Sequence, residues 1–479
     1  MQHLLNYING ELVNAHSQQF MDNYNPATGK VYSLIPDSDE KDVEDAYQAA
    51  KSAFFAWKNT SNEDRFIILN RIAELIDLNN DELAKAESID QGKPHWLAKN
   101  EMIRSAQNFR FFATAAMQFS SESHHMEGHA VNYTLRQPIG VVACISPWNL
   151  PLYLFSWKIA PALAAGNCVV AKPSEITPMT AFMLSKICQE AGLPKGVLNI
   201  IHGIGPKVGS TLVSHPHIKA VSFTGGTSTG KHIASIAAPM FKKLSLELGG
   251  KNPSIVFADC DFEKAVKTTV QSSFLNQGEI CLCGSRILIE RSIYDKFKEA
   301  LIQEVKQLKV GNPLDKDTKV GAIVSQLHYD KVLSYLQLAK EEGGNILTGG
   351  EAIHLEGDLA NGWYIAPTVI ENLAYDCRTN TEEIFGPVVT ITPFDSEEEA
   401  LQMANCTEYG LASIIWTQDI TRAHNLAAQI QSGIVWINCW LLRDLRTPFG
   451  GVKNSGVGRE GGWEAMKFFT EPKNVCIKL

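Results

Sequence analysis

The sequence predicts an α/β protein built from two doubly wound parallel sheets. Between Val141 and Ile255, short apolar runs alternate with helical stretches; the runs read VVACIS, NCVVAKP, VLNIIHG, AVSFTGG and SIVFA. The intervening segments hold roughly a dozen residues or more, the length that a crossover between parallel strands needs. The alternation resumes from Asn252 to about Phe449, through VIENLAYD, TEEIFGPVVTITPF and ASIIWTQD. Strands alternating with helices indicate a second α/β unit.

The residues before the first sheet predict a layer of helices that follows a short pair of strands. Apolar residues recur at helical spacing over 39–57 and again over 66–76. Ser61 and Asp64 form a plausible capping box for the second of these helices. The segment 102–117 predicts a further helix.

Composition excludes several classes of protein. A chain of 479 residues is long enough for about three domains. Its net charge of −9 argues against nucleic acid or an anionic membrane as the main partner. There is no basic and then apolar leader at the N-terminus, and no run of about 18 apolar residues, so we expect a cytoplasmic protein. The cysteines are scattered, which predicts neither a disulfide framework nor a metal site.

One cysteine is a candidate nucleophile. Cys281 lies in FLNQGEICLCGSR, at the expected end of a helix that begins near Asp261. A free cysteine is most often a small buried hydrophobe. Two other groups favour a catalytic role here: Glu247 in LSLELGGKNP and Asn149 in ISPWNLP. A nucleophile, a base and an oxyanion donor are the parts that an acyl-forming cysteine enzyme needs.

The motifs resemble those of the aldehyde dehydrogenase superfamily. ISPWN, FTGGTSTG, LELGGKNP, NQGEICLC, EEIFGPV and PFGGVKNSG occur in this order over nearly the whole chain. Within that superfamily, NCWLLRDLRTPFGG is most similar to the branch that oxidises 2-aminomuconic or 2-hydroxymuconic semialdehyde. The resemblance implies an NAD-binding domain (1–118 and 137–250), a catalytic domain (251–448) and a β arm (119–136 and 464–479). The arm would pair subunits into a homodimer or homotetramer.

The resemblance also implies NAD as the cofactor. Gly225 and Gly226 close a predicted strand and open a helix, so bare backbone amides can meet a pyrophosphate. The superfamily usually has serine at the position of Gly226, so contact here should depend on amides and on Thr227. Lys172 and Glu175 would hold the adenine ribose, and the carboxylate would repel a 2′-phosphate, which favours NAD over NADP.

Further cofactor contacts are implied by the same resemblance. Glu383 would hold the nicotinamide ribose and Phe385 would pack against the nicotinamide ring. The remaining expected contacts are Ser146, Trp148 and Leu248. The glycines of the loop 203–209 imitate a dinucleotide fingerprint, but their final spacing is wrong, and we interpret that loop as a turn.

The expected reaction passes through a covalent intermediate. Cys281 would attack the aldehyde as a thiolate, and the Asn149 side chain with the Cys281 backbone N–H would stabilise the resulting alkoxide. After hydride transfer, Glu247 would activate the water that hydrolyses the thioester, with a pKa raised by burial. Cys283 competes for the nucleophile role, but the spacing of the superfamily motif selects Cys281.

The muconic semialdehyde branch implies a substrate that carries a carboxylate. Arg104 and Arg443 would grip that carboxylate, with Arg110 and Arg446 in reserve. The expected apolar lining is Trp157 and Phe449.

Three alternative functions stay open. They are a broad-range dehydrogenase that accepts retinal-like aldehydes, a catalytically silent structural relative, and an enzyme that passes the acyl group to coenzyme A. Intact Cys281, Glu247 and Asn149 argue against a silent protein. Glu247 also disfavours acyl transfer to coenzyme A, because that chemistry does not need a base that activates water.

Overall fold

A computed structural model describes all residues, 1–479. The N-terminal region holds five short strands instead of the single predicted pair: β1 (Gln2–His3), β2 (Asn6–Ile8), β3 (Glu11–Val13), β4 (Phe20–Asn25) and β5 (Lys30–Pro36). Four helices follow, α1 (Glu40–Lys58), α2 (Asn62–Leu78), α3 (Asn80–Gln91) and α4 (His95–Gln118). The predicted capping box of α2 is confirmed, because Ser61 Oγ accepts from the Asp64 N–H at 3.0 Å and Asp64 Oδ2 accepts from the Ser61 N–H. Helix α4 begins before the predicted residue, directly after Pro94.

The first sheet has the order β24-β12-β11-β8-β9-β10-β2-β3. Its five central strands are parallel: β8 (Val141–Ile145), β9 (Cys168–Lys172), β10 (Leu198–Ile200), β11 (Ala220–Thr224) and β12 (Lys243–Glu247). The outer strands are antiparallel to their neighbours: β24 (Gly456–Val457) pairs with β12, and β2 pairs with β10 and with the edge strand β3. The crossovers contain α5 (Pro151–Ala164), α6 (Met179–Glu190), α7 (Ser210–Ser214) and α8 (Thr227–Ala237).

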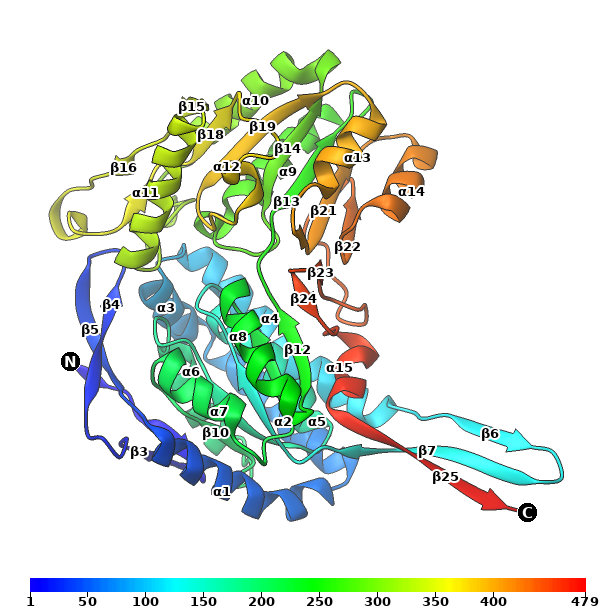
Figure 1. The fold of residues 1–479 in the computed structure, drawn as a ribbon. Helices are drawn as coiled ribbons and strands as arrows, with labels where there is room; N and C mark the ends of the chain where they lie inside the picture. Colours follow the sequence, from blue (N-terminus) through cyan, green and yellow to red (C-terminus); the bar gives the residue numbers. More distant parts are fainter.

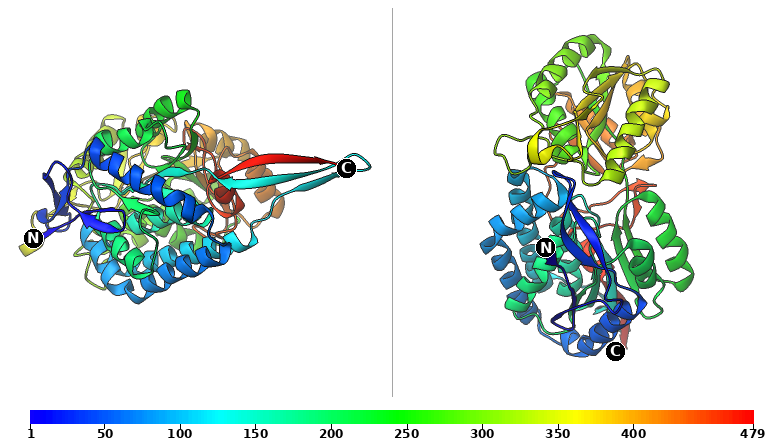
Figure 2. Two further views of the ribbon diagram at one scale, coloured as in Figure 1. Left: turned by 90° about the horizontal axis from the view of Figure 1, so that it is seen from below. Right: turned by 90° about the vertical axis from the view of Figure 1, so that its left-hand side faces the viewer.

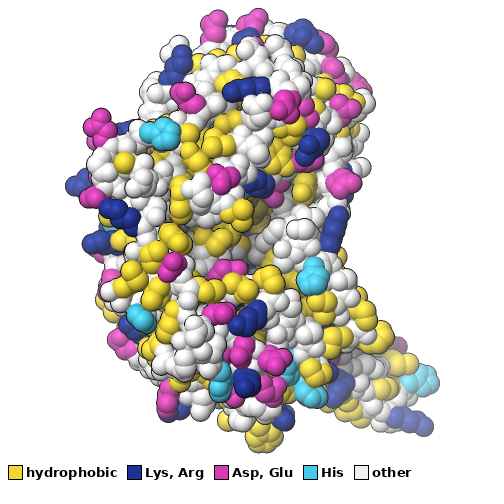
Figure 3. Space-filling model, turned by 60° about the vertical axis from the view of Figure 1, so that its left-hand side comes forward, with side chains coloured by type: hydrophobic (Ala, Val, Ile, Leu, Met, Phe, Trp, Pro, Cys, Tyr) yellow, Lys and Arg dark blue, Asp and Glu magenta, His cyan; other side chains and the backbone are white.

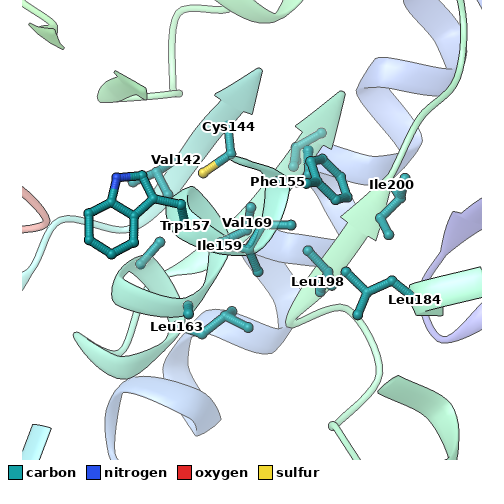
Figure 4. Close-up of a cluster of buried hydrophobic side chains, with 14 of the residues drawn as sticks. Val142, Cys144, Phe155, Trp157, Ile159, Leu163, Val169, Leu184, Leu198 and Ile200 are labelled. Carbon is teal, nitrogen blue, oxygen red and sulfur yellow. The ribbon is translucent and has the colours of Figure 1, made fainter. Parts of the chain in front are cut away.

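The main core lies between this sheet and its helices. Val142, Val169 and Leu198 come from three neighbouring strands and are almost completely buried. Figure 4 shows them gathered with Phe155 and Ile159 of α5. Burial of each such side chain stabilises the fold by about 1.5 to 3 kcal/mol. The sheet is therefore a rigid base for the loops at its carboxyl edge.

The predicted run SIVFA does not belong to the first sheet. It falls in β13 (Asn252–Val256), which is a central strand of the second sheet, whose order is β15-β18-β19-β14-β13-β21-β22. The first sheet is completed instead by β12, which the list of apolar runs did not include. The sequence of β12, KLSLE, is not a continuous apolar run because Lys243, Ser245 and Glu247 alternate with leucines.

The second sheet is covered by helices on both faces (Figure 1). Val256 of β13 packs with residues of α9 (Phe262–Phe274) and α10 (Tyr294–Lys306). Its neighbour Ile255 packs with residues of α13 (Glu397–Asn405) and α14 (Ile420–Gln429) on the opposite face. Opposite orientation of successive residues is the period-2 pattern of a strand. The other strands are β14 (Gly284–Glu290), β15 (Asn345–Thr348), β18 (Thr368–Glu371), β19 (Val388–Phe394), β21 (Ala412–Trp416) and β22 (Ile434–Ile437).

Cys281 is not at the end of a helix, which corrects the prediction. Helix α9 has Asp261 as its N-cap, as expected, but it ends at Phe274. A short 3₁₀ turn, Leu275–Gly278, follows it, and Asn276 and Gln277 have φ values of 54° and 56°. Left-handed backbone at two successive residues cannot continue an α-helix. The cysteine therefore lies in a loop between that turn and β14.

A three-stranded arm extends from the body of the molecule (Figures 1 and 2). It consists of β6 (Ser123–Met126), β7 (Ala130–Pro138) and β25 (Thr470–Lys478), all antiparallel. Helix α15 (Gly462–Phe468) precedes β25. The remaining elements are helix α11 (Gln326–Glu341) and the short α12 (Arg378–Thr381), β16 (Ala352–Ile353), β17 (Tyr364–Ile365), β20 (Tyr409–Gly410) and β23 (Val452–Lys453). None of the helices combines the length and apolar character needed to cross a bilayer.

Candidate active site and cofactor cleft

The carboxyl end of the first sheet faces the second unit, and the surface is hollowed between them (Figure 3). One pocket in this region contains both Cys281 and Glu247. Arg104, Arg443 and Phe449 line the same pocket. Five residues from four distant parts of the sequence, all predicted as site residues, are thus brought to one place.

The loop that carries Cys281 is held by side chains of other elements. Asn252 Nδ2, at the start of β13, donates to the Cys281 carbonyl at 2.7 Å and to the Cys283 carbonyl at 2.9 Å. Trp440 Nε1 donates to the Leu282 carbonyl at 2.9 Å. These bonds fix three successive peptide units, so the thiol is presented from a defined backbone position.

The two cysteines of this loop face different cavities. Cys281 lines the pocket that contains Glu247, whereas Cys283 lines a separate small cavity with Glu383 and Phe385. Cys283 is buried and Cys281 is partly exposed. This geometry favours Cys281 over Cys283 as the nucleophile.

Burial raises the pKa of the Cys281 thiol, and the carboxyl groups of Glu383 and Glu247 raise it further. Arg443 acts in the opposite direction. A buried thiol among carboxyl groups is neutral at rest, because a thiolate there would be poorly solvated. The nucleophile must therefore be activated when substrate and cofactor are present.

Glu247 ends β12 and is buried, with 3% of its surface exposed. Neither of its carboxyl oxygens has a hydrogen-bond partner. Burial raises its pKa well above the ordinary carboxyl value, and Glu460 raises it further, while Lys158 opposes this shift. Gly450 makes room for the group, since a Cβ at that glycine would lie 2.5 Å from Glu247 Oε1. A carboxyl group with free oxygens and a raised pKa is suited to act as a general base.

Asn149 lies in the loop after β8 and is buried. Its Nδ2 donates to the Glu279 carbonyl at 3.0 Å, which occupies one of its two amide hydrogens. Its own carbonyl accepts from Lys93 Nζ at 2.9 Å and from Asn276 Nδ2 at 3.1 Å. The Cys281 backbone N–H donates to no protein acceptor. The second N–H of the Asn149 amide and the Cys281 backbone N–H thus have no acceptor in the protein.

Replacing Asn149 with alanine should slow the first turnover by about 10² to 10³, the usual cost of losing one oxyanion donor. Rapid-mixing measurement of NADH formation checks this. Asn425, exposed on α14, is the control position, where alanine should leave the rate unaltered. An unchanged first turnover in the Asn149 variant would remove this residue from the oxyanion site.

The largest cleft near the carboxyl edge of the first sheet has a volume of about 520 Å³, within the usual range for small-molecule sites. Six of the predicted cofactor residues line it: Ser146, Trp148, Lys172, Glu175, Gly225 and Gly226. Helix α8 begins at this cleft, and its N-cap Gly226 offers no side-chain cap. The first N–H groups of α8 are therefore open to an anion.

The lack of a side chain has a different structural meaning at Gly225 and at Gly226. A Cβ at Gly225 would lie 2.4 Å from the Phe223 ring, so this position excludes a side chain. A Cβ at Gly226 would meet nothing within 4 Å. The absence of a side chain at Gly226 thus leaves open space directly at the helix terminus, where a pyrophosphate would fit.

Lys172 and Glu175 form an ion pair at the edge of this cleft, with Nζ 2.9 Å from Oε2. Glu175 Oε1 also accepts from the Gly205 N–H at 3.1 Å. Burial opposes ionisation of Glu175, but Lys172 and the amide contacts outweigh it and lower its pKa. The carboxylate is therefore negative at the place where a ribose would lie, and it disfavours a phosphate there.

Four of the predicted cofactor residues do not line the cleft. Ser228 and Thr229 line it in place of Thr227, and Leu248 packs against Gly230 of α8. Glu383 accepts from the Gly250 N–H at 2.8 Å beside the small cavity that contains Cys283. Phe385 lies 5.2 Å from the Trp148 ring, in an edge-to-face arrangement. The rings of Phe385 and Trp148 thus connect the small cavity to the cleft.

The loop 203–209 was interpreted as a plain turn, but it lines the cleft. Gly205–Gly209 form one turn of π-helix, and Gly205, Pro206 and Gly209 contact the cavity. The signal that could have revealed this is the position of the loop after β10, since ligands on such sheets lie beyond the carboxyl ends of strands.

The predicted arginines Arg104 and Arg443 converge on one side chain that sequence reasoning missed. Arg104 Nη2 donates to the Tyr153 hydroxyl at 3.0 Å, and Arg443 Nη1 donates to it at 2.7 Å. The Arg443 guanidinium also lies 4.1 Å from the Phe449 ring centre. Trp157 is not in the pocket lining, but its ring is 5.0 Å from the same guanidinium.

The reserve arginines are engaged elsewhere. Arg110 pairs with Asp77, and Arg446 pairs with Asp444. Arg104 and Arg443 have no carboxylate partner in the protein, as neither forms an ion pair. A pair of uncompensated guanidinium groups in the pocket of Cys281 is therefore available to an anionic ligand.

Comparison with known proteins agrees with this geometry. Residues 12–475 match the model of the aldehyde dehydrogenase family. The chain is 48% identical to a 2-aminomuconic semialdehyde dehydrogenase of Mus musculus, covering 99% of this chain and 98% of that protein. It is 45% identical to a 2-hydroxymuconic semialdehyde dehydrogenase of Pseudomonas sp. (strain CF600), with full coverage of both. An NAD⁺ complex of an aldehyde dehydrogenase from Bacillus cereus is similar in structure, with a TM-score of 0.97 and 38% identity, covering 100% of this chain and 97% of that one.

Proposed function

Because the chain belongs to the aldehyde dehydrogenase family, we propose that it oxidises a semialdehyde that carries a carboxylate, with NAD as cofactor. The favoured substrates are 2-aminomuconic and 2-hydroxymuconic semialdehyde, on which similar proteins act by name. The proposal rests on the guanidinium groups of Arg104 and Arg443, which lie in the pocket of Cys281 and form no ion pair with a carboxylate of the protein.

The protein residues supply the acyl-transfer part of the reaction. The Cys281 thiolate adds to the aldehyde carbon, and the oxyanion that forms accepts from Asn149 Nδ2 and the Cys281 N–H. NAD, when bound, accepts the hydride that this tetrahedral adduct releases. Glu247 then takes a proton from water as the water attacks the thioester, which frees the acid and restores the thiol.

The residues present fit a dinucleotide. The open N–H groups of α8 would hold the pyrophosphate, and the ion-paired Lys172 and Glu175 would hold the adenine ribose. Glu383 and Phe385 would contact the nicotinamide end, near the loop that carries the cysteines. The ionised Glu175 favours a ribose with a free 2′-hydroxyl, as in NAD.

The remote carboxylate of the substrate needs a partner, since burying an unpaired charge costs several kcal/mol. Two acidic groups of the pocket do not compete with it for the arginines, because each has its own lysine partner. Glu101 is engaged by Lys93 at 2.5 Å, and Glu460 by Lys158 at 2.6 Å. The two guanidinium groups are thus the cations that stay free to bind it.

Alanine at Arg104 or at Arg443 should raise KM for 6-oxohexanoate tenfold or more, because a hydrogen bond to a charged group contributes about 1.5 to 3 kcal/mol. Hexanal has the same chain length without the carboxylate, so its KM should change far less. Steady-state kinetics with both aldehydes and with 2-hydroxymuconic semialdehyde checks this.

Arg110 and Arg446 provide matched controls, because they lie on the same helix and in the same loop but pair with Asp77 and Asp444. Their alanine variants should keep the preference for the acid. Equal losses on 6-oxohexanoate and hexanal in the Arg104 and Arg443 variants would refute the carboxylate clamp.

A hydrolytic dehydrogenase and an enzyme that acylates coenzyme A differ in the molecule that removes the acyl group from Cys281. The unpaired, raised-pKa Glu247 supports hydrolysis by water over transfer to coenzyme A. NADH formation measured with NAD and an aldehyde, with and without coenzyme A, separates the two. A silent structural protein would form no NADH in either case, and a broad-range enzyme would oxidise hexanal and retinal as efficiently as the acid.

The domain organisation is part of the same proposal. Residues 1–118 and 137–250 form the cofactor domain, 251–448 the catalytic domain, and 119–136 with 464–479 the arm. The arm strands expose Met126, Leu135 and Ile477, which supports pairing with another subunit. Light scattering should give the mass of a dimer or a tetramer, and a monomer mass would contradict this role of the arm.

A further inference from the structure

The geometry points to Tyr153 as a third group that binds the substrate carboxylate, through its hydroxyl proton, and that sets the preference of the enzyme for acidic aldehydes. This inference rests on the proposed function, because it assumes that Arg104 and Arg443 face the carboxylate. It adds a specificity-determining residue that the sequence motifs did not single out.

Tyr153 lies in the first turn of α5, and 2% of its surface is exposed. It lines the pocket that contains Cys281 and Glu247. The Arg104 guanidinium stacks on its ring, 4.2 Å from the ring centre. The tyrosine therefore contacts one arginine with its ring and both arginines with its hydroxyl.

The Tyr153 hydroxyl uses its capacity to accept hydrogen bonds but not its capacity to donate one. A phenol oxygen has two acceptor lone pairs and one proton to donate. Arg104 Nη2 and Arg443 Nη1 donate to it at 3.0 and 2.7 Å, so both lone pairs are used. The proton has no acceptor in the protein, because those two bonds are the only ones that the hydroxyl makes. A buried hydroxyl proton without an acceptor is costly unless a ligand supplies one.

Two guanidinium groups and one hydroxyl proton thus converge without a carboxylate partner in the protein. The other acids of the pocket are less available: Glu101 and Glu460 are engaged by lysines, and burial raises the pKa of Glu247, which disfavours its charged form. A carboxylate, which is planar and has two oxygens, can accept from all three donors at once. The hydroxyl also bridges the two arginines, which holds both cations in place before the substrate arrives.

The test is the conservative variant Tyr153→Phe in the full-length enzyme. Its preference for 6-oxohexanoate over hexanal, taken as the ratio of the two kcat/KM values, should fall about tenfold. The fall should come from KM for the acid and not from kcat. Adipate, a dicarboxylate that cannot be oxidised, should inhibit the variant about tenfold less tightly, a measurement that does not depend on turnover. Tyr24→Phe, exposed at the surface, is the matched control and should keep both values.

The outcomes separate this inference from the proposed function. If Arg443→Ala lowers the preference for the acid but Tyr153→Phe does not, the tyrosine is only a structural neighbour and the inference is wrong. If Tyr153→Phe impairs hexanal and 6-oxohexanoate equally, the same conclusion holds. If neither the arginine variants nor Tyr153→Phe alters the preference, the carboxylate clamp and the role of Tyr153 both fail.

Discussion

Replacement of Cys281 with alanine is expected to lower NADH formation by about 10⁵ or more, the scale of loss when a covalent nucleophile is removed. No other thiol faces the pocket that contains Glu247, because Cys283 lines a different cavity. Binding of NAD should persist, since Cys281 is not part of the cleft lined by Lys172 and Gly226. Steady-state NADH formation and titration of NAD by tryptophan fluorescence are the two measurements.

Cys283→Ala is the matched control for this prediction. It removes a thiol two residues away from the same loop while the Asn252 bonds to the backbone carbonyls remain. We expect substantial activity in this variant, with a modest loss of stability from the small cavity that it creates. A dead Cys283→Ala enzyme beside an active Cys281→Ala enzyme would overturn the assignment of the nucleophile.

Glu247→Gln should separate formation of the thioester from its hydrolysis. The amide has nearly the shape of the carboxyl group but cannot take a proton from water. The variant should release a burst close to a single equivalent of NADH per active site and then stall, with steady turnover reduced by about 10² to 10⁴. Rapid mixing with NAD and an aldehyde, followed by detection of the acyl-enzyme by mass spectrometry, checks both phases.

The pH dependence of the intact enzyme provides a second test of Glu247. Burial raises the pKa of this carboxyl group, so the group is protonated at low pH and inactive as a base. Hydrolysis of the thioester should therefore accelerate as the pH rises through the raised pKa, and it should fail below it. In Glu247→Gln this rise should disappear. A variant without any burst would instead show that Glu247 acts before the thioester forms.

Most of the strands of both sheets could be predicted from sequence because buried parallel strands are short continuous apolar runs, although no predicted run covered β12, β14, β15 or β22. The boundary between the sheets could not be predicted from the same signal. SIVFA and AVSFTGG are equally apolar, yet one enters β13 and the other β11. Which sheet a strand joins depends on pairing with distant strands, such as β14 for β13, and local patterns do not contain that information.

Motifs indicated residues that lie together in one pocket, whereas a residue that packing brings there was not indicated. Cys281, Glu247, Arg104 and Arg443 meet in one pocket, as the sequence suggested. Tyr153 was not predicted as a site residue because a tyrosine in an apolar helix is usually part of the hydrophobic core. The role proposed for it rests on the two arginines from distant segments that reach its hydroxyl. Ser228 and Thr229 line the cleft beside the predicted Thr227, and local sequence does not show which hydroxyl of the first turn of α8 faces a cavity.

The short segment between β12 and β13 bears on how the two units of the protein can move relative to each other. Glu247 ends β12, and Asn252, which holds the Cys281 loop, begins β13 only a few residues later. This extended segment lies at the boundary between the two units, where a hinge would lie. If the units swing apart to admit the dinucleotide, points far from the hinge separate most and points beside it least. The base and the anchor of the nucleophile would then move least, so the enzyme could open and close around its cofactor without taking its catalytic pair apart.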